Sequence, residues 1–505
     1  MDATKPFDAS TAADVILRSS DSVDFSVIKL LLCLISPVFN VMFLSKHIAT
    51  ADAETRKGLP VVSVTEDSET LRCLLLLIYP SYVSDSESAL DINVLYRVAK
   101  AAQKYCMDRI EGEMMKMVTT SRLLQEHAFR VYASAAAVGW TDVAAAAALS
   151  TLKTPLSDLP FVDELKIISG ADFYHFLTYR FKHDKYGGEG EEPQLIFASQ
   201  SPTANGRPLT IVTNASPSFG RTEKADAILR SLDGTDFYIK RSFLTHLSPV
   251  FEELFADDDG VLCETIEQGN DPPVFTVDQD SDALAGLLCF LHPCVDEPHI
   301  EDIKLYPKIW AAAEHYKVTF LAQRLERLFL ASPFIQAEPW RAFAVGVMCG
   351  WTSAMKASAM KTLEEPLNEM KYVEEFRSIT GADLHHLVKY RFKCANVVCT
   401  LGDKAIVDSP VNFKKYIIPM KPRLLECPRG ITLMRDDRDL VKAARLKEKV
   451  GSSFASDESK VCDFLKHRKI LAADIDAKVC EVCHVKLFRL CNANCFSQVD
   501  LSDYL

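Results

Sequence analysis

The sequence has little that would suit it to nucleic acid, to a membrane or to secretion. Lysine and arginine number 57 against 69 aspartates and glutamates, a net charge of −12, so no general positive field attracts nucleic acid. The apolar run at residues 30–44 is interrupted by Ser36 and Pro37 and is shorter than the roughly 20 residues of a membrane span. The first ten residues lack a secretory signal. We therefore expect a soluble protein of the cytoplasm, the nucleus or both, with no membrane partner.

The motifs of common enzyme classes are also missing. The sequence contains no GxGxxG, GxxxxGKS/T, GxSxG or HExxH string, and its 12 histidines are scattered. We therefore expect a protein that is not an enzyme. A hydrophobic content of 48% and a charged content of 25% are typical of globular proteins. At a prior of roughly 150 residues per domain, 505 residues predict about three folded units.

What the sequence does contain is an internal repeat. Residues 14–21, DVILRSSD, recur at 226–233 as DAILRSLD, and Ser36-Pro37-Val38-Phe39 returns as Ser248-Pro249-Val250-Phe251. The correspondence continues to Tyr-Arg-Phe-Lys at 179–182 and at 390–393. Each copy is much longer than the 20–50 residues of a solenoid repeat. The sequence therefore predicts two copies of a whole domain, each with its own extension.

The residue pattern within one copy predicts a few strands followed by helices. Short β-rich pieces at 14–18 and 25–27 flank a turn and predict a hairpin. The other expected elements are a helix at 29–35, a helix starting at Pro37, a strand at 61–64, a buried helix at 68–79 and helical regions at 94–118 and 125–148. This order predicts an α+β domain with a small sheet, followed by an all-α extension.

These residues resemble the BTB/POZ domain, here in tandem. The strings Asp-Val-Ile-Leu, Ser-Pro-Val-Phe and Met-Phe, then a strand, an apolar helix and Tyr-Pro, carry the resemblance. The predicted fold class is α+β, with two BTB/POZ-like domains, each followed by an all-α extension, and a Cys-rich C-terminal segment. The expected boundaries are 11–118 for the first domain, 122–183 for its extension, 184–221 for a flexible linker, 223–331 for the second domain, 335–393 for its extension and 394–505 for the C-terminal region.

The resemblance implies binding rather than catalysis. It implies a scaffold with protein partners that dimerises, either between two chains or by pairing of the two copies within one chain. It also implies a buried charged pair between Asp14 and Lys29, and another between Asp226 and Arg241, with turn capping by the two aspartates as the alternative. The residues expected to serve folding and pairing are Asp14, Lys29, Ser36, Phe39, Asp226, Arg241, Ser248 and Phe251.

Many members of this family hand substrates to cullin ubiquitin ligases, and those that bind cullins carry a hydrophobic-x-acidic triplet. The second copy contains such a triplet at Leu262-Cys263-Glu264, which makes Leu262 and Glu264 the candidate cullin contacts. An ordinary surface loop is the alternative, since the first copy has no convincing counterpart. A ubiquitin-ligase adaptor is thus one form that the scaffold function can take.

Residues 394–505 hold eight of the fifteen cysteines. Two close thiol pairs, Cys480 with Cys483 and Cys491 with Cys495, have the kind of spacing that offers thiolates to one tetrahedral zinc. His484 is an alternative ligand, and Cys394 with Cys399 is an alternative pair to complete a site with Cys480 and Cys483. An amphipathic helix is the alternative to a zinc site for this segment. Most of the cysteines are expected to be reduced thiols that pack as small apolar residues. Zinc is therefore the one cofactor that the sequence suggests.

The C-terminal region also contains a basic stretch. Residues 411–450 include eleven lysines and arginines against five acidic residues. This suggests a second function, a nuclear transcription regulator whose basic, Cys-rich C-terminal region contacts nucleic acid. Aromatic residues are few in this stretch and are not interleaved with the charges, so we favour a solvated helical face and do not expect nucleic acid as a partner.

Overall fold

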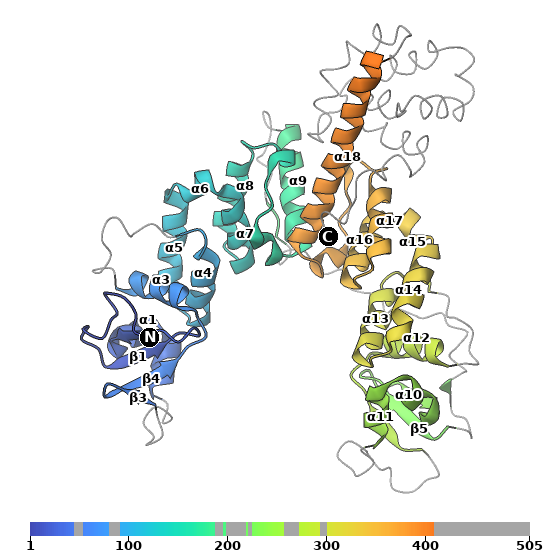
Figure 1. Cartoon of the computed structure of the whole chain (residues 1–505), viewed down its shortest axis with the longest axis horizontal. Coiled ribbons are helices and arrows are strands. Elements are labelled where there is room, and N and C mark those ends of the chain that lie inside the picture. The colour runs from blue at the N-terminus through green and yellow to red at the C-terminus, as the bar shows by residue number, and fades with distance from the viewer. Residues whose placement is uncertain are drawn as a thin grey trace. The chain divides into compact units, whose positions relative to one another are not determined.

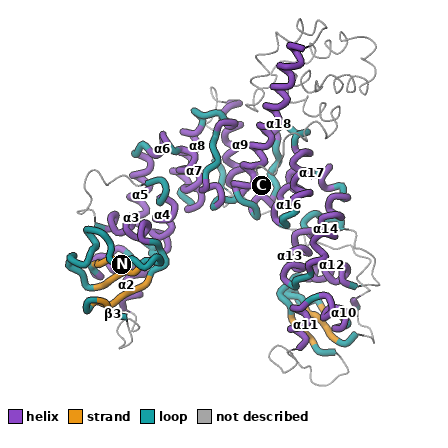
Figure 2. Tube along the Cα trace, in the orientation of Figure 1, coloured by secondary structure: helices purple, strands orange, loops and turns teal. Residues whose placement is uncertain are grey.

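The computed structural model of the chain describes residues 1–44, 54–79, 91–186, 195–197, 219–220, 225–256, 272–292 and 300–408. The chain divides into two compact units, one built from Met1–Gln200 with Thr380–Ala382 and the other from the remainder. Figure 1 labels the elements of each unit. In each unit the strands gather at one end and helices make up the rest, as Figure 2 shows. Within the described part of the chain, no helix combines the length and apolar character needed to cross a membrane.

A small mixed sheet forms one end of the first unit. Its strands are β1 (Val15–Arg18), β2 (Asp24–Val27), β3 (Thr55–Arg56) and β4 (Leu59–Ser63), in the order β2-β1-β4-β3. β1 pairs antiparallel with β2 and parallel with β4. The β1–β2 turn contains Ser22 in the left-handed conformation, with φ of 64°. Almost every residue of β1 and β2 is buried, so these two strands form the centre of the domain core.

Five helices accompany this sheet within the described residues. They are α1 (Lys29–Ile35), α2 (Pro37–Leu44), α3 (Ser68–Ile78), α4 (Leu95–Lys104) and α5 (Asp108–Thr120). α1 ends at Ser36, after which Pro37 begins α2 at the position that proline favours. Asp67 caps α3 by accepting the backbone N–H of Thr70 at 2.8 Å. Short-range sequence signals therefore set the helix ends.

A wholly helical extension completes the first unit. Its elements are α6 (Leu123–Glu126), α7 (Ala128–Val138), α8 (Thr141–Thr151), the 3-10 helices η3 (Leu156–Asp158) and η4 (Asp163–Lys166), and α9 (Gly170–Tyr186). Gly139, with φ of 83°, ends α7 in the left-handed conformation. The buried Arg180 of α9 donates to the backbone carbonyls of Thr151 at 2.9 Å and Thr154 at 2.5 Å. Arg180 thereby satisfies carbonyls at and beyond the end of α8.

The second unit repeats this order of elements. Its sheet contains β5 (Ala227–Arg230), β6 (Asp236–Ile239) and β7 (Val274–Thr276), in the order β6-β5-β7. Its helices are α10 (Arg241–Leu247), α11 (Pro249–Ala256), α12 (Ser281–Leu291), α13 (Leu305–His315), α14 (Thr319–Ala331), α15 (Phe334–Ala337), α16 (Pro339–Met348), α17 (Thr352–Thr362), the 3-10 helices η7 (Leu367–Glu369) and η8 (Glu374–Arg377), and α18 (Gly381–Asp408).

The two units agree in detail as well as in order. β5 pairs antiparallel with β6 and parallel with β7, as β1 does with β2 and β4. Gly350, with φ of 67°, follows Cys349, the C-cap of α16, and stands at the position that matches Gly139. Arg391 of α18 donates to the carbonyls of Thr362 and Glu365, as Arg180 does in the first unit, and burial lowers the pKa of Arg391 to about 10. The second unit therefore shares with the first its strand pairing and the contacts of its buried arginine.

Most of the predicted elements are confirmed. The helix at residues 29–35, the helix beginning at Pro37, the hairpin and the third strand are all present. The helical regions at 94–118 and 125–148 each contain two main helices, because Cys106 and Gly139 take left-handed conformations that end the first helix of each region. β3 is not predicted by the sequence analysis. It is only two residues long and pairs with β4 across a turn at Lys57 and Gly58, both with positive φ.

Candidate interaction site

Ser36 joins α1 and α2 to the end of α4. Its side chain donates a hydrogen bond to the backbone carbonyl of Tyr105 at 2.6 Å and accepts the backbone N–H of Phe39 at 3.1 Å, and the residue is fully buried. Ser248 makes the same two bonds in the second unit, at the same distances. The serine thus caps the helix that Pro37 or Pro249 begins, and it fixes that helix against an element nearly seventy residues further along the chain.

We expect Ser36→Ala to lower the free energy of unfolding by about 1–3 kcal/mol, because it leaves a buried carbonyl and a buried N–H without this partner. Ser248→Ala should do the same in the second unit. Urea unfolding followed by hydrogen exchange assigns each loss to its unit. Ser150→Ala, at a half-buried hydroxyl that bonds the carbonyl one turn back in α8, is the matched control and should change little. A loss as small as that of the control would contradict the assigned role.

Phe39 packs in the same joint. Its ring stacks on Tyr105 with centroids 4.4 Å apart and lies 5.7 Å from the ring of Phe43. Phe251 repeats the stack on Tyr316, with centroids 4.1 Å apart. Both phenylalanines are buried, so they position α2 and α11 from within the core. Both phenylalanines therefore serve folding directly. They affect the binding of a partner only by positioning α2 and α11.

The buried charged pair implied for Asp14 with Lys29, and for Asp226 with Arg241, is wrong. Both aspartates are exposed, and each accepts a hydrogen bond from the backbone N–H of the basic residue, at 2.6 and 2.7 Å. The ammonium of Lys29 lies over the ring of Phe43 at 5.6 Å, and the Arg241 guanidinium lies over Phe275 at 5.0 Å. The first turn of a helix has N–H groups without helical partners, and the aspartates satisfy one of these.

A second aspartate anchors each hairpin turn to the following helix. Asp21 accepts hydrogen bonds from the side chain of Ser19 at 2.6 Å and from the backbone and side chain of Ser68 at 2.9 and 2.6 Å. Asp233 does the same with Ser231 and Ser281. The bond from Ser19, then those from Ser68, lower the pKa of the Asp21 carboxyl. The corresponding bonds lower the pKa of Asp233.

These lowered pKa values predict loss of stability in acid. The free energy of unfolding should change little from pH 7 to pH 5 and fall as the pH drops through about 4, where the unfolded state binds protons first. Asp21→Asn together with Asp233→Asn should reduce stability at pH 7 and flatten this fall, because both groups then stop titrating. Urea unfolding at each pH measures the curve. Equal slopes for the wild type and the double variant would show that other carboxyls carry the effect.

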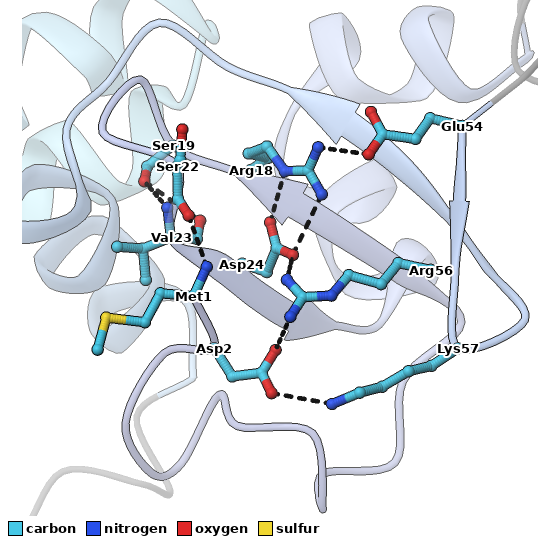
Figure 3. Close-up of polar contacts among 10 residues, drawn as sticks. All are labelled: Met1, Asp2, Arg18, Ser19, Ser22, Val23, Asp24, Glu54, Arg56 and Lys57. Atoms are coloured by element: carbon cyan, nitrogen blue, oxygen red, sulfur yellow. Dashed lines mark hydrogen bonds and ion pairs between the residues drawn. The ribbon is translucent and has the colours of Figure 1, made fainter.

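Asp24 lies at the centre of a charged network in the first unit (Figure 3). Its side chain is only 2% exposed and pairs with the guanidinium groups of Arg18, at 2.7 Å, and Arg56. The corresponding aspartate of the second unit, Asp236, pairs with Arg230 and is 33% exposed. The same fold position therefore holds a buried ion pair in one unit and a partly solvated pair in the other. The sequence analysis does not single out Asp24.

The network also fastens the N-terminal segment to the sheet. Asp2 bridges Arg56 at 3.2 Å and Lys57 at 2.9 Å, as Figure 3 shows. Backbone bonds from Ala3 N–H to the Asp24 carbonyl, and from Asp24 N–H back to the segment, place residues 1–7 beside β2. Phe7 is fully buried there, and Phe219 packs in the same way in the second unit. The segment therefore covers the open edge of β2, which would otherwise invite pairing with another chain.

The surface of α1 and α2 carries the most exposed large apolar side chains on the described helices. Leu30 and Leu34, one turn apart on α1, are 65% and 73% exposed, and Val41 on α2 is 68% exposed. Of the sixteen residues from Lys29 to Leu44, only Lys29 is charged. We call Leu30, Leu34 and Val41 the α1–α2 face. The sequence analysis does not predict this face. A comparison of the residues at matched positions of the two copies is the signal that could have identified it.

Several predicted site residues lie outside the described residues. These are Leu262 and Glu264, the four cysteines Cys480, Cys483, Cys491 and Cys495, most of the 184–221 linker and the basic stretch at 411–450. In the described ranges, no group of three or more histidine, cysteine, aspartate or glutamate side chains is arranged to hold a metal ion. Six cysteines are free thiols: Cys33, Cys73, Cys106, Cys289, Cys349 and Cys394. Burial raises the pKa of Cys289 and of Cys394 to about 11.

The first unit thus begins with an α+β domain whose small sheet is covered by helices and whose α1–α2 face is apolar and exposed, features that suit an interaction domain. Comparison with the models of known families gives the same class, because residues 4–122 match the BTB/POZ domain. The chain therefore contains a BTB/POZ domain, an interaction and dimerisation domain, in its first unit. Comparison with curated proteins gives no match.

Proposed function

We propose that the chain is a non-enzymatic scaffold with two BTB/POZ domains that binds protein partners and self-associates. The observation that carries this proposal is the repetition of side-chain hydrogen bonds between the units. The Ser36, Asp14 and Asp21 bonds of the BTB/POZ domain recur at Ser248, Asp226 and Asp233. The buried bonds of Ser36 and Ser248 specify one packing arrangement, so their recurrence, together with that of the exposed aspartate bonds, supports a second domain of the same family.

The helical extensions fit a scaffold. Each follows its domain directly, with α6 three residues after α5 and α15 three residues after α14. Buried Arg180 and Arg391 hold the last helix of each extension to the helix pair before it. Such a unit presents a broad surface and works by burial of apolar area and complementary shape rather than by a catalytic step. We propose that the extensions position partners bound at each domain.

The mass of the full-length chain in solution tests self-association. We expect the mass measured by light scattering to rise from the 56.3 kDa of one chain toward twice that value across a concentration series from low micromolar to about 100 µM. A mass of one chain at every concentration would contradict the proposal of a self-associating scaffold. Cullin co-purification that is lost on Leu262→Asp with Glu264→Ala would identify the scaffold as a ligase adaptor.

A further inference from the structure

The turn that follows α8 in the first unit matches the turn that follows α17 in the second, at an offset of 211 residues. In each, the backbone N–H of one turn residue, Thr154 or Glu365, donates to the carbonyl three residues earlier, at 3.0 and 3.2 Å. A proline follows that residue, with ψ of 146° and 143°. A buried arginine, Arg180 or Arg391, donates to its carbonyl. The two turns therefore share one backbone arrangement and differ in the side chain at this position.

The second unit places a carboxylate at this position. Glu365 accepts a hydrogen bond from the indole N–H of Trp340 at 2.7 Å, and the ring of Trp340 lies 5.0 Å from the guanidinium of Arg391. The carboxylate also attracts that guanidinium electrostatically. In the first unit the hydroxyl of Thr154 stands at the matched position, and Arg180 stands at that of the second arginine. The first unit therefore keeps the cation of this arrangement and has a neutral hydroxyl in place of the anion.

Thr154 precedes a proline, and proline-directed protein kinases phosphorylate a serine or threonine in that setting. The chain contains seven such pairs, which begin at Ser36, Thr154, Ser201, Ser216, Ser248, Ser332 and Ser409. Four of them lie within the described residues. Ser36 and Ser248 are buried, and the half-buried Ser332 donates to the carbonyl of Phe329 at 2.6 Å. Thr154 is exposed, so accessibility singles it out among the four described pairs.

We propose that Thr154 is a phosphorylation site for a proline-directed protein kinase, and that its phosphate pairs with the guanidinium of Arg180. The threonine hydroxyl attacks the terminal phosphorus of ATP, the bond from that phosphorus to ADP breaks, and a base of the kinase takes the hydroxyl proton. The product carries about −1.5 to −2 charges and three acceptor oxygens. It supplies at Thr154 the anion that Glu365 supplies in the second unit.

Arg180 is placed to receive this phosphate. Its guanidinium donates to the Thr154 carbonyl at 2.5 Å, so a phosphate on the same residue lies close to it. Arg180 is buried, and a guanidinium screened from water attracts an anion more strongly than one on the surface. The end of α8 disfavours an anion, because the helix dipole is negative there. The second unit nevertheless holds Glu365 at the same end of α17, so this turn accommodates a negative charge.

The kinase reaction tests the site. The full-length chain is incubated with a proline-directed kinase and ATP, and mass spectrometry locates the phosphate. We expect phosphate on Thr154, its loss in Thr154→Ala, and its retention in Thr154→Ser, the matched control that keeps the hydroxyl and the following proline. A folded chain that takes no phosphate at Thr154 would overturn the proposal.

Phosphorus NMR tests the pairing with Arg180. The resonance is assigned by its absence from Thr154→Ala, and its shift is followed across a pH series. A nearby guanidinium should lower the second pKa of the phosphate, ordinarily about 6, by at least about 1 in the folded chain relative to the same phosphorylated chain in urea. Hydrogen exchange should also slow in peptides covering residues 151–158. Equal phosphate pKa values in the folded and unfolded chain would overturn the role of Arg180. The inference is independent of the scaffold function, which the mass of the chain tests separately.

Discussion

Phe39→Ala is expected to lower the free energy of unfolding of the first unit by about 3–5 kcal/mol, the usual loss when a fully buried phenylalanine is truncated. The ring of Phe39 lies against Tyr105 with 4.4 Å between centroids. Its removal would leave a cavity among α1, α2 and the end of α4. The Ser36 bonds to Tyr105 and Phe39 tie the same elements together, so the backbone there has little freedom to collapse into the space.

Phe251→Ala should produce a loss of the same size in the second unit, because Phe251 stacks on Tyr316 in the same geometry. Phe39→Leu is the conservative control and should cost much less, since it retains most of the apolar volume. Urea unfolding gives the total loss, and hydrogen exchange of peptides from β1 and β5 assigns it to a unit. A loss below about 1 kcal/mol for Phe39→Ala would show that the joint repacks around the missing ring.

The sequence predicts most of the fold because its strongest signals are local. Ser36-Pro37 can only end one helix and begin the next, and the two copies repeat this signal independently. A short polar turn between two β-rich pieces likewise predicts the hairpin around Asp21. The turns at Cys106 and Lys57 are not predicted, because residues other than glycine seldom adopt positive φ and neither residue type indicates that conformation.

The candidate site is less predictable, because burial and pairing depend on distant partners. The run from Lys29 to Ile35 is apolar at almost every position, so no periodicity separates the buried Leu32 from the exposed Leu30 and Leu34. Asp24 and Asp236 occupy the same strand position beside an arginine. Only the packing of Arg56, 32 residues further along the chain, shows that Asp24 is the buried one.

Asp24→Ala is expected to destabilise the first unit by about 3–5 kcal/mol, the range found when one partner of a buried ion pair is removed. The 2% exposed carboxylate lies between Arg18 and Arg56, and its loss leaves the two guanidinium groups close together with only the more exposed carboxylates of Glu54 and Asp2 as partners. The N-terminal segment should also loosen, because Arg56 holds Asp2 from the same position. Hydrogen exchange should therefore speed up in residues 1–7 as well as in β2.

The second unit supplies the control for this prediction. Asp236→Ala removes the aspartate at the same strand position, but Asp236 is 33% exposed and water screens its pair with Arg230, so the expected loss is below about 1 kcal/mol. The two substitutions are chemically identical and differ only in burial and in the number of cations. A larger loss of stability for Asp24→Ala than for Asp236→Ala would therefore measure how much the buried network stabilises the first unit beyond a single exposed pair. Equal losses would mean that desolvation of Asp24 cancels what its second arginine contributes.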